Sequence, residues 1–189
     1  MPELAVNIAI MHAGRILLTQ REDFEVWCLP GGAVDPGESV AQAAVREARE
    51  ETGLDVALTR LVGIYSRPKG SQGGVHHILF AAQPVGGTLE FLPEEVIDAG
   101  YFDPNALPEP LLAWHRQQIA DALRGAQGLA WTQNLAWPFD QGMTRQALYD
   151  MRDRSGLTRQ QFYLQHFVEL GPEDAVLEVG DVPLSEAGS

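Results

Sequence analysis

The feature that most constrains this chain of 189 residues is a loop rich in glycine and proline, residues 31–38, that leads directly into a helix. Glycine gives the loop access to backbone angles that other residues avoid. Ser39 predicts the helix start as its N-cap, with Gln42 as the second half of a capping box. Gly53 predicts the helix end, because glycine readily adopts the left-handed conformation of a C-cap. Apolar residues at helical spacing indicate the face that packs on a core: Ala41, Ala44, Val45 and Ala48.

Three glutamates share one face of this predicted helix. Glu47, Glu50 and Glu51 stand at positions i, i+3 and i+4, which are neighbours on a helix surface. Like charges in this arrangement destabilise an isolated helix by about 0.2–0.5 kcal/mol per pair. A divalent cation would reverse the sign of that effect, because Mg²⁺ prefers carboxylate oxygens as ligands. Taken alone, the helix therefore fits either a solvated acidic face or a metal site.

The loop before the helix favours the metal site. Fixed residue types recur at set spacings through the loop and the helix: Gly32, Glu38, Arg46, Glu47, Glu50, Glu51, Gly53 and Leu54. This pattern resembles the Nudix box, and the flanking sequence is similar to the Nudix hydrolase family as far as residue 128. Ala48 departs from the family pattern, which prefers a larger aliphatic residue there, and this difference concerns packing rather than chemistry.

The resemblance implies an α/β fold, an α/β/α sandwich whose mixed sheet lies between the box helix and a later helix. It also implies a reaction, the hydrolysis of a phosphoanhydride bond in a nucleoside diphosphate linked to a group X, with water attacking phosphorus. The substrate class covers nucleoside di- and triphosphates, ADP-ribose and nucleotide sugars. The implied cofactor is Mg²⁺ or Mn²⁺.

The same resemblance implies roles for the acidic residues. Glu47 and Glu51 are the expected metal ligands, Glu50 is expected to share a second ion, and the carbonyl of Gly32 is expected to complete the shell. Many family members carry a further carboxylate in a later loop, as a metal ligand or as the general base. Glu95, with its neighbour Glu94, matches that loop by its position before an aromatic strand.

Two more residues of the box have supporting roles in this interpretation. Arg46 is expected to orient the carboxylates through a salt bridge, with Glu50 four residues on as one partner. Glu38 is expected to buttress the loop against the helix.

Three basic residues are candidates for contacts with the substrate. Arg21 ends a predicted strand, where related proteins often direct an arginine at the substrate phosphates, although an ion pair with Glu22 or Asp23 fits equally well. Arg67 and Lys69 lie in a glycine-rich loop of the kind that borders the cleft in this fold. A solvated loop is the alternative for both.

Composition limits the partners and the compartment. The formal net charge of −13 argues against nucleic acid and acidic membranes as partners. Metal ions and a few local basic residues would have to offset its repulsion of a phosphate substrate, so no activity is expected without divalent metal. The single cysteine, Cys28, excludes an internal disulfide, is best read as a buried thiol, and fits a reducing compartment. No signal peptide or membrane span is recognisable, so a cytoplasmic protein is expected.

Two alternatives to a hydrolase fit these residues less well. A binding or regulatory module with the same fold usually lacks some of the box glutamates, and all of them are present here. An isopentenyl diphosphate isomerase needs a catalytic cysteine and glutamate outside the box, whereas Cys28 precedes the loop. The hydrolase is favoured.

Apolar and β-branched runs on both sides of the box predict further elements. Asn7 is a polar interruption in the first of these runs. The adjacent His76 and His77 must point to opposite faces of a strand, so at most one of them can line a cleft. The predicted strands cover residues 4–11, 15–21, 26–30, 54–65, 75–83 and 101–102, and a second long helix covers residues 110–124 with Leu111, Leu112, Trp114, Ile119 and Leu123 facing the sheet.

Three parts of the chain are predicted: a hydrolase domain over residues 1–128, a helical appendage over 129–170 and an acidic tail over 171–189. Thr144 and Thr158 are N-cap candidates for two short helices in the appendage. Such short helices need partners, so the appendage is expected to dock on the main domain or on a second subunit, which leaves a homodimer open. Docking beside the cleft would restrict the group X. Leu148, Met151, Phe162, Leu164 and Phe167 are expected to be buried, and a strand is expected at residues 175–179.

Overall fold

The computed structural model of the chain describes residues 2–70, 73–91, 94–135, 137–167 and 174–180. Four helices are present in these segments: α1 (Val40–Thr52), α2 (His115–Leu123), α3 (Arg145–Arg154) and α4 (Arg159–His166). The strands are β1 (Glu3–His12), β2 (Arg15–Arg21), β3 (Trp27–Cys28), β4 (Gly31–Ala33), β5 (Leu54–Arg67), β6 (Val75–Gly87), β7 (Val96–Phe102), β8 (Leu129–Gln133) and β9 (Ala175–Val179). No helix of the described segments is long and apolar enough to cross a membrane.

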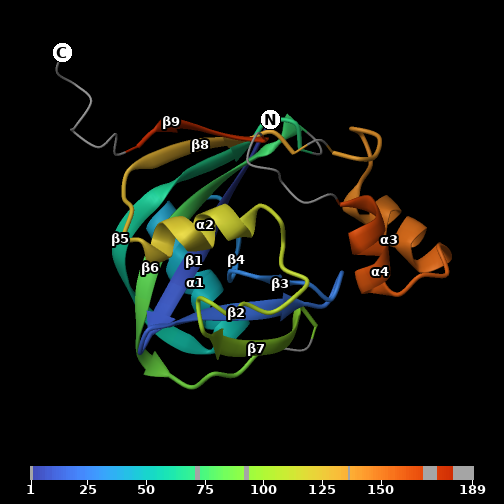
Figure 1. Ribbon diagram of the computed structural model, residues 1–189. Helices are drawn as coiled ribbons and strands as arrows, with labels where there is room; N and C mark the ends of the chain where they lie inside the picture. Colours follow the sequence, from blue (N-terminus) through green and yellow to red (C-terminus); the bar gives the residue numbers. More distant parts are fainter. Residues whose placement is uncertain (1, 71–72, 92–93, 136, 168–173, 181–189) are drawn as a thin grey trace, which may run out of the picture.

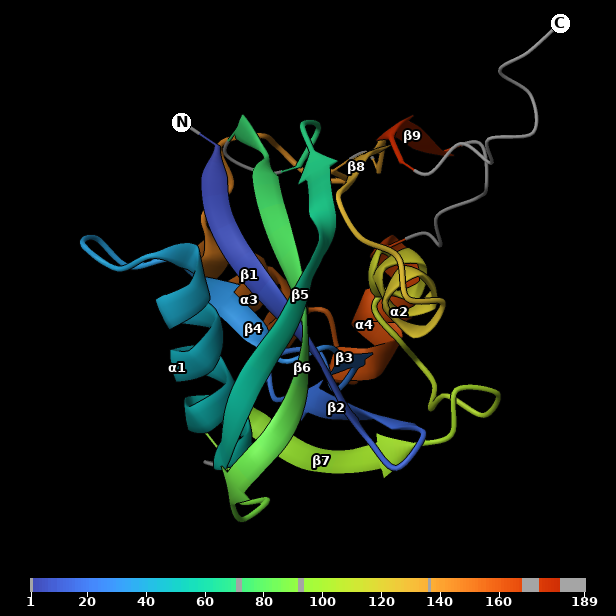
Figure 2. The same cartoon turned by 90° about the vertical axis from the view of Figure 1, so that its left-hand side faces the viewer.

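The strands form one mixed sheet with the order β3-β2-β1-β6-β5-β8-β9, while β4 pairs with β1 and β7 pairs with β2. β1 runs parallel to β6, and β5 runs antiparallel to β6 and parallel to β8. Helix α1 covers one face of the sheet and α2 the other (Figures 1 and 2). The predicted α/β sandwich with a mixed sheet is confirmed.

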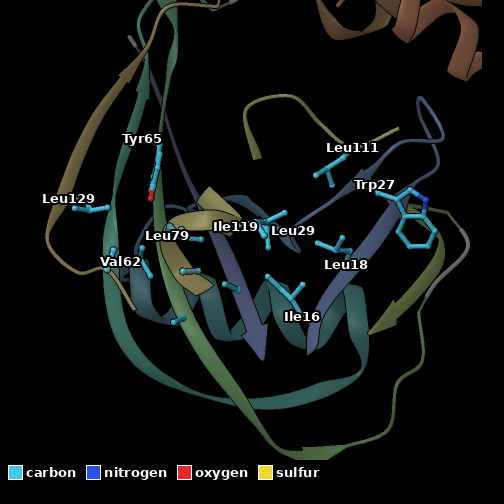
Figure 3. Packing of buried hydrophobic residues seen from close by; sticks show 14 residues of the cluster. Ile16, Leu18, Trp27, Leu29, Val62, Tyr65, Leu79, Leu111, Ile119 and Leu129 are labelled. Carbon is cyan, nitrogen blue, oxygen red and sulfur yellow. The ribbon is translucent and has the colours of Figure 1, made fainter. Parts of the chain in front are cut away.

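Each face of the sheet has its own hydrophobic core. On the side of α1, Ala43, Ala44 and Ala48 are fully buried against the strands. The predictions for Ala41 and Val45 were wrong, because both are exposed. Alanine side chains let α1 approach the sheet closely, so its buried stripe is narrow and excludes the positions at its margin. On the side of α2, aliphatic side chains from the strands surround Ile119 (Figure 3).

The second long helix is shorter than predicted. It begins at His115 rather than at residue 110, because the preceding segment pairs with β3 instead. The Trp27 amide donates to the Pro110 carbonyl at 2.8 Å, and the Leu112 amide donates to the Trp27 carbonyl at 2.8 Å. Leu111 is buried in the core beside the sheet as predicted, whereas Leu112 is buried in a separate cluster around Phe24. Of the other residues expected to face the sheet, Ile119 is buried, Trp114 half-buried and Leu123 36% exposed.

Two strands have no counterpart in the predictions, and one is longer than predicted. β4 is formed by two glycines and an alanine that pair with β1, in a stretch predicted as loop. β7 begins at Val96 rather than at residue 101. β8 follows directly after Gly128, where the main domain was predicted to end, and pairs with β5. The predicted strand at residues 175–179 is confirmed as β9, which pairs with β8.

Residues 137–167, called here the C-terminal module, contain α3 and α4. Both predicted caps are present: Thr144 accepts from the Ala147 amide at 3.2 Å, and Thr158 forms a capping box. The module packs on the main domain through an aromatic cluster that includes Phe24 from the turn between β2 and β3, and Figure 1 shows both helices beside this turn. The predicted burial was wrong for two residues, because Met151 is 38% and Leu164 60% exposed on the solvent side of short helices. Leu148, Phe162 and Phe167 are buried as predicted.

Candidate active site

Helix α1 presents the glutamates of the box at its junction with β4. Ser39 caps the helix by accepting from the Gln42 amide, and the Gln42 side chain completes the predicted capping box. Gly53 closes the helix in the left-handed conformation with φ 71°. The helix is thus fixed at both ends, and the spacing of Glu47 and Glu51 directs both carboxylates at the β4 segment.

Glu51 lies deepest of these carboxylates. Its Oε2 atom accepts a hydrogen bond from the Gly31 amide at 3.0 Å. Burial raises the pKa of Glu51 from its ordinary value of 4.5 to about 8, although the Gly31 amide and the nearby charge of Arg21 act in the opposite direction. The negative charges of Glu47 and Glu95 raise that pKa further. A cation placed here would therefore stabilise the ionised form of Glu51.

Glu47 packs against the backbone of Gly32. A Cβ atom added at Gly32 would lie 2.4 Å from Oε1 of Glu47, so a side chain at this position would displace the carboxylate. Only 12% of the Glu47 side chain is exposed, and burial raises its pKa. Gly32 is therefore needed for the close approach of the loop to the helix.

One guanidinium group connects the box. Arg46 donates from Nη1 to Glu47 at 2.7 Å and to Glu50 at 3.0 Å. It donates from Nη2 and Nε to the two carboxylate oxygens of Glu38 at 2.7 and 3.2 Å, and Nη2 also reaches the Ala33 carbonyl at 3.0 Å. The structure thus places Arg46 and Glu38 where the sequence-based roles require them, with the arginine between loop and helix.

The donor set suits a hard divalent cation, although no three carboxylates, imidazoles or thiolates converge into a ready cage within the described segments. Glu47 and Glu50 share Arg46, and Glu51 follows Glu47 by four residues on the same helix, so these three carboxylates would hold the ion. These donors are all carboxylate oxygens, which Mg²⁺ and Mn²⁺ prefer over nitrogen or sulfur. The raised pKa of Glu51 shows a buried carboxylate without a full counter-charge. The residues therefore fit the implied metal.

A cavity of about 670 Å³ opens beside this cluster of glutamates. Gly31 and Gly32 line one end of it, so the cavity reaches the backbone against which Glu47 and Glu51 are held. Its floor is one face of the three central strands β1, β6 and β5, and α2 begins at its wall. Ligand pockets of proteins commonly enclose about 300–1,000 Å³. A cavity of this size next to acidic ligands can hold a small nucleotide.

The sequence model described as NUDIX domain matches residues 1–122. The chain belongs to the Nudix hydrolase family. A Bacillus subtilis (strain 168) protein provisionally named as an 8-oxo-dGTP diphosphatase is 41% identical over 123 residues, which cover 65% of this chain and 80% of that protein. The ADP-ribose pyrophosphatase of Methanocaldococcus jannaschii is 37% identical over 131 residues, 67% of this chain and 76% of that enzyme.

Solved structures agree with this assignment. The crystal structure of an ADP-ribose pyrophosphatase from Streptococcus suis 89-1591 has a TM-score of 0.59 and 33% sequence identity. The similarity covers 66% of this Nudix hydrolase and 92% of the streptococcal chain. The resemblance seen in the sequence is therefore confirmed at the level of family and fold.

Of the three basic residues predicted to contact substrate, the structure brings two into the cavity of the Nudix domain. Arg21 lines the cavity, and its ion pair with Asp23 confirms the alternative interpretation of this residue, whereas its contact with substrate phosphates stays a prediction. Arg67 lines the cavity with its guanidinium 4.1 Å from the centroid of the Trp114 ring, and its Nε atom is buried without a partner in the described segments. Lys69 is exposed and is absent from the described lining of the cavity.

Glu95 and Cys28 are two further residues for which the sequence predicted a role or an environment. Glu95 is exposed, and its main-chain carbonyl accepts from the Glu22 amide at 3.0 Å. Because its charge raises the pKa values of Glu47 and Glu51, Glu95 lies within electrostatic reach of the metal ligands proposed for this Nudix hydrolase. Cys28 is buried, and burial raises the pKa of its thiol to about 12, as expected for an inert structural cysteine.

Sequence reasoning missed a buried polar network at the cavity wall. Asn7 donates from Nδ2 to Oε1 of Gln118 at 2.7 Å, and the Leu29 amide donates to Nδ1 of His115 at 2.9 Å. Burial holds the pKa of His115 well below its ordinary value, so the imidazole is neutral. Asn7 and His115 both line the cavity. The one available signal was the polar Asn7 within an apolar strand.

The two adjacent histidines separate as the alternation of strand β6 predicts. His77 lines the cavity, while His76 lies within hydrogen-bond distance of the Ser66 hydroxyl at 2.9 Å. Burial lowers the pKa of His77 well below its ordinary value, and its Nδ1 atom has no hydrogen-bond partner within the described residues. His77 therefore presents a neutral imidazole to the cavity of the Nudix domain, and its Nδ1 atom can form a hydrogen bond with a ligand there.

The hydrogen bonds of Asp23 are expected to make the stability of the folded protein depend on pH. Burial alone would raise its pKa, but hydrogen bonds from Arg21 and Tyr149 hold that pKa below the ordinary value of 3.8. A carboxylate with a lowered pKa in the folded state stabilises the fold above its unfolded pKa and loses this contribution as the pH falls. Asp23→Asn is therefore expected to lower the free energy of unfolding by about 2 kcal/mol at pH 7. The difference from wild type should shrink below pH 3.8.

Urea denaturation at pH 7 and at pH 3 measures the free energy of unfolding of Asp23→Asn and of wild type. Asp150→Asn serves as the control, because Asp150 forms only surface contacts within α3, and its effect should stay within about 0.5 kcal/mol. A destabilisation by Asp23→Asn that is the same at both pH values would contradict the prediction.

Proposed function

We propose that this Nudix hydrolase uses Mg²⁺ or Mn²⁺ to hydrolyse a phosphoanhydride bond in a nucleoside diphosphate linked to a group X. The observation that carries this proposal is the position of the glutamates of α1 at the glycine-lined end of a cavity large enough for a nucleotide. This arrangement puts metal ligands and a binding space for the nucleotide side by side. The products would be a nucleoside monophosphate and phosphorylated X.

In this proposal Glu47, Glu50 and Glu51 would hold the metal, and the Gly32 carbonyl and Glu95 are further donors. A bound divalent ion would supply Lewis acidity for the charge that builds up on the pyrophosphate oxygens. Arg46 keeps Glu47 and Glu50 aligned through its hydrogen bonds to both. The raised pKa of Glu51 indicates that the site favours extra positive charge at this depth.

The basic residues of the cavity would bind the substrate. Arg21 and Arg67 both line it, and an arginine fork matches the geometry of phosphate oxygens. Burial lowers the pKa of Arg67 to about 9, and the nearby charge of Glu3 supplies only a partial counter-charge. An anionic substrate would supply the rest of that counter-charge. Two cations at the cavity thus offset, locally, the repulsion from a chain of net charge −13.

Two features narrow the substrate class. The relatives named above act, by their names, on ADP-ribose and on 8-oxo-dGTP, and both molecules are compact nucleoside diphosphate derivatives. The cavity of about 670 Å³ suits molecules of that size. The acidic surface of the protein disfavours a long polyanion. We therefore propose a small nucleotide as substrate and a cytoplasmic location, where nucleotides and a reduced Cys28 are expected.

A nucleotide panel tests this proposal. ADP-ribose, 8-oxo-dGTP, nucleotide sugars and capped RNA are each incubated with the protein, and release of monophosphate and of phosphate is measured. Turnover of at least one small nucleotide is expected with Mg²⁺ or Mn²⁺, and it should fall to background in EDTA and return when metal is added in excess. Capped RNA should be hydrolysed more slowly than the preferred small nucleotide at equal concentration.

Three outcomes would contradict the proposal. Turnover that persists in EDTA would exclude the metal-dependent reaction. Tighter binding of RNA than of free nucleotides in a competition assay would exclude the proposed substrate class. Binding of nucleotides without hydrolysis under all metal conditions would instead indicate a regulatory module of the same fold.

A further inference from the structure

The cavity is lined in part by residues beyond the Nudix match, which ends at residue 122. Arg145, Leu148 and Tyr149 of α3 contribute to its wall, as do Tyr163 of α4 and Phe167 just after that helix. The C-terminal module therefore forms part of the binding space.

Asp23 connects this module with the floor of the cavity. Arg21 donates to Asp23 twice, from Nε to Oδ1 at 2.9 Å and from Nη2 to Oδ2 at 2.5 Å. The hydroxyl of Tyr149 donates to the same Oδ2 atom at 3.0 Å. Asp23 is 9% exposed, so these hydrogen bonds are largely shielded from water. One carboxylate thus joins a residue of the module to an arginine of the Nudix domain.

Arg21 retains one free nitrogen in this arrangement. Nε and Nη2 are used by Asp23, whereas Nη1 has no hydrogen-bond partner among the residues that the structure describes. Arg21 also lines the cavity, so this nitrogen is available as a donor to a ligand there.

Side chains of the C-terminal module form hydrogen bonds with the turn between β2 and β3 and fix its position. Arg152 of α3 donates to the main-chain carbonyl of Asp23, and Arg159 of α4 donates to both the carbonyl and the carboxylate of Glu22. The ring of Phe24 packs among the aromatic side chains of the module. Because the module contacts three successive residues of the turn, Glu22, Asp23 and Phe24, the hydroxyl of Tyr149 has a fixed position relative to Asp23.

We propose that Tyr149 is a positioning residue that acts through Asp23 to hold Arg21 in the orientation that binds the phosphates of the nucleotide. The physical reason lies in Oδ2 of Asp23, which accepts from both Tyr149 and Arg21. A carboxylate held by one arginine alone can rotate with it, whereas a third donor from a rigid helix fixes the plane of the carboxylate and so the fork of the arginine. The inference rests on the proposed function, since it assigns a ligand to the same cavity.

A double-mutant cycle on the full-length chain tests this inference. The variants are Tyr149→Phe, Arg21→Ala and the double variant, and the dissociation constant of ADP-ribose is measured by calorimetry in metal-free buffer. Tyr149→Phe should raise this constant about fivefold, the factor that the loss of one hydrogen bond typically brings. In the Arg21→Ala background the same change should have no further effect, because Tyr149 acts only through Arg21. In assays with Mg²⁺, Tyr149→Phe should raise KM by a similar factor and leave kcat within about twofold of wild type.

Gln146→Ala is the matched control, because Gln146 is exposed on α3 and its side chain donates only to Asp150 among the residues that the structure describes. It should leave the dissociation constant and KM unchanged, and thermal unfolding should show that all variants fold. The inference is overturned if Tyr149→Phe has no effect on binding, or if its effect is equally large with and without Arg21. Binding without hydrolysis by the wild type would contradict the proposed reaction, yet the cycle on the dissociation constant would still decide the role of Tyr149. A wild-type chain that binds no nucleotide would overturn both.

Discussion

Glu51→Gln is expected to lower kcat by about a hundredfold or more, while the protein remains folded. The substitution keeps the shape of the side chain and removes the charge from the deepest carboxylate of the cluster, whose Oε2 atom accepts from the Gly31 amide. Loss of one charged metal ligand should remove several kcal/mol of transition-state stabilisation, and about 2.7 kcal/mol already corresponds to a hundredfold. The measurement is kcat on the preferred nucleotide at saturating Mg²⁺.

The matched control is Glu90→Gln, the same chemical change at an exposed glutamate outside the cluster, which should leave kcat unchanged. Because burial penalises the charged form of Glu51 and raises its pKa to about 8, the metal-free Glu51→Gln variant should be at least as stable as wild type at pH 8. Retention of more than about a tenth of the wild-type kcat, a loss of only ~1.4 kcal/mol, would refute the role of Glu51.

Phe24→Ala is expected to lower the free energy of unfolding by about 3 kcal/mol. Phe24 is 8% exposed, and its ring centroid lies 5.7–6.3 Å from the centroids of four aromatic rings of the C-terminal module: Tyr149, Phe162, Tyr163 and Phe167. Truncation to alanine would leave a void at the junction between module and Nudix domain. Urea denaturation followed by tryptophan fluorescence measures the loss.

Leu164→Ala provides the comparison for this prediction. Leu164 also belongs to the module, but it is 60% exposed, so its truncation should cost no more than about 0.5 kcal/mol. Equal effects of the two substitutions would show that the junction at Phe24 does not stabilise the protein. A small effect of Phe24→Ala would likewise indicate that the module is a passive attachment.

The parts of the fold that local sequence signals determine could be predicted. Helix α1 begins and ends where Ser39 and Gly53 indicate, because caps act on neighbouring residues. The contact of Arg46 with Glu50 follows from helical spacing in the same way. The three glutamates of the proposed metal site could be grouped from the sequence for the same reason, since all of them stand on one continuous helix.

Elements that depend on distant partners could not be predicted in this way. β4 consists of Gly31, Gly32 and Ala33, which have little strand propensity and become a strand only because β1 lies beside them. α2 begins at His115 rather than at the predicted residue 110, because residues 110–112 form hydrogen bonds with β3 instead. The link from Tyr149 to Asp23 spans 126 positions in the sequence, and no periodicity of either segment indicates it.

The antiparallel pairing of β8 with β9 affects how a chain of this fold can acquire new substrates. Gln133 of β8 pairs with Ala175 of β9, and the Asn134 amide donates to the Asp174 carbonyl at 2.6 Å. The chain therefore leaves the sheet and returns to it at adjacent points, which places the C-terminal module in an insertion between β8 and β9. Such an insertion can be exchanged for another of different length at little entropic cost to the sheet. A lineage could thus replace the wall of its cavity in one recombination step while the glutamates of α1 stay as they are.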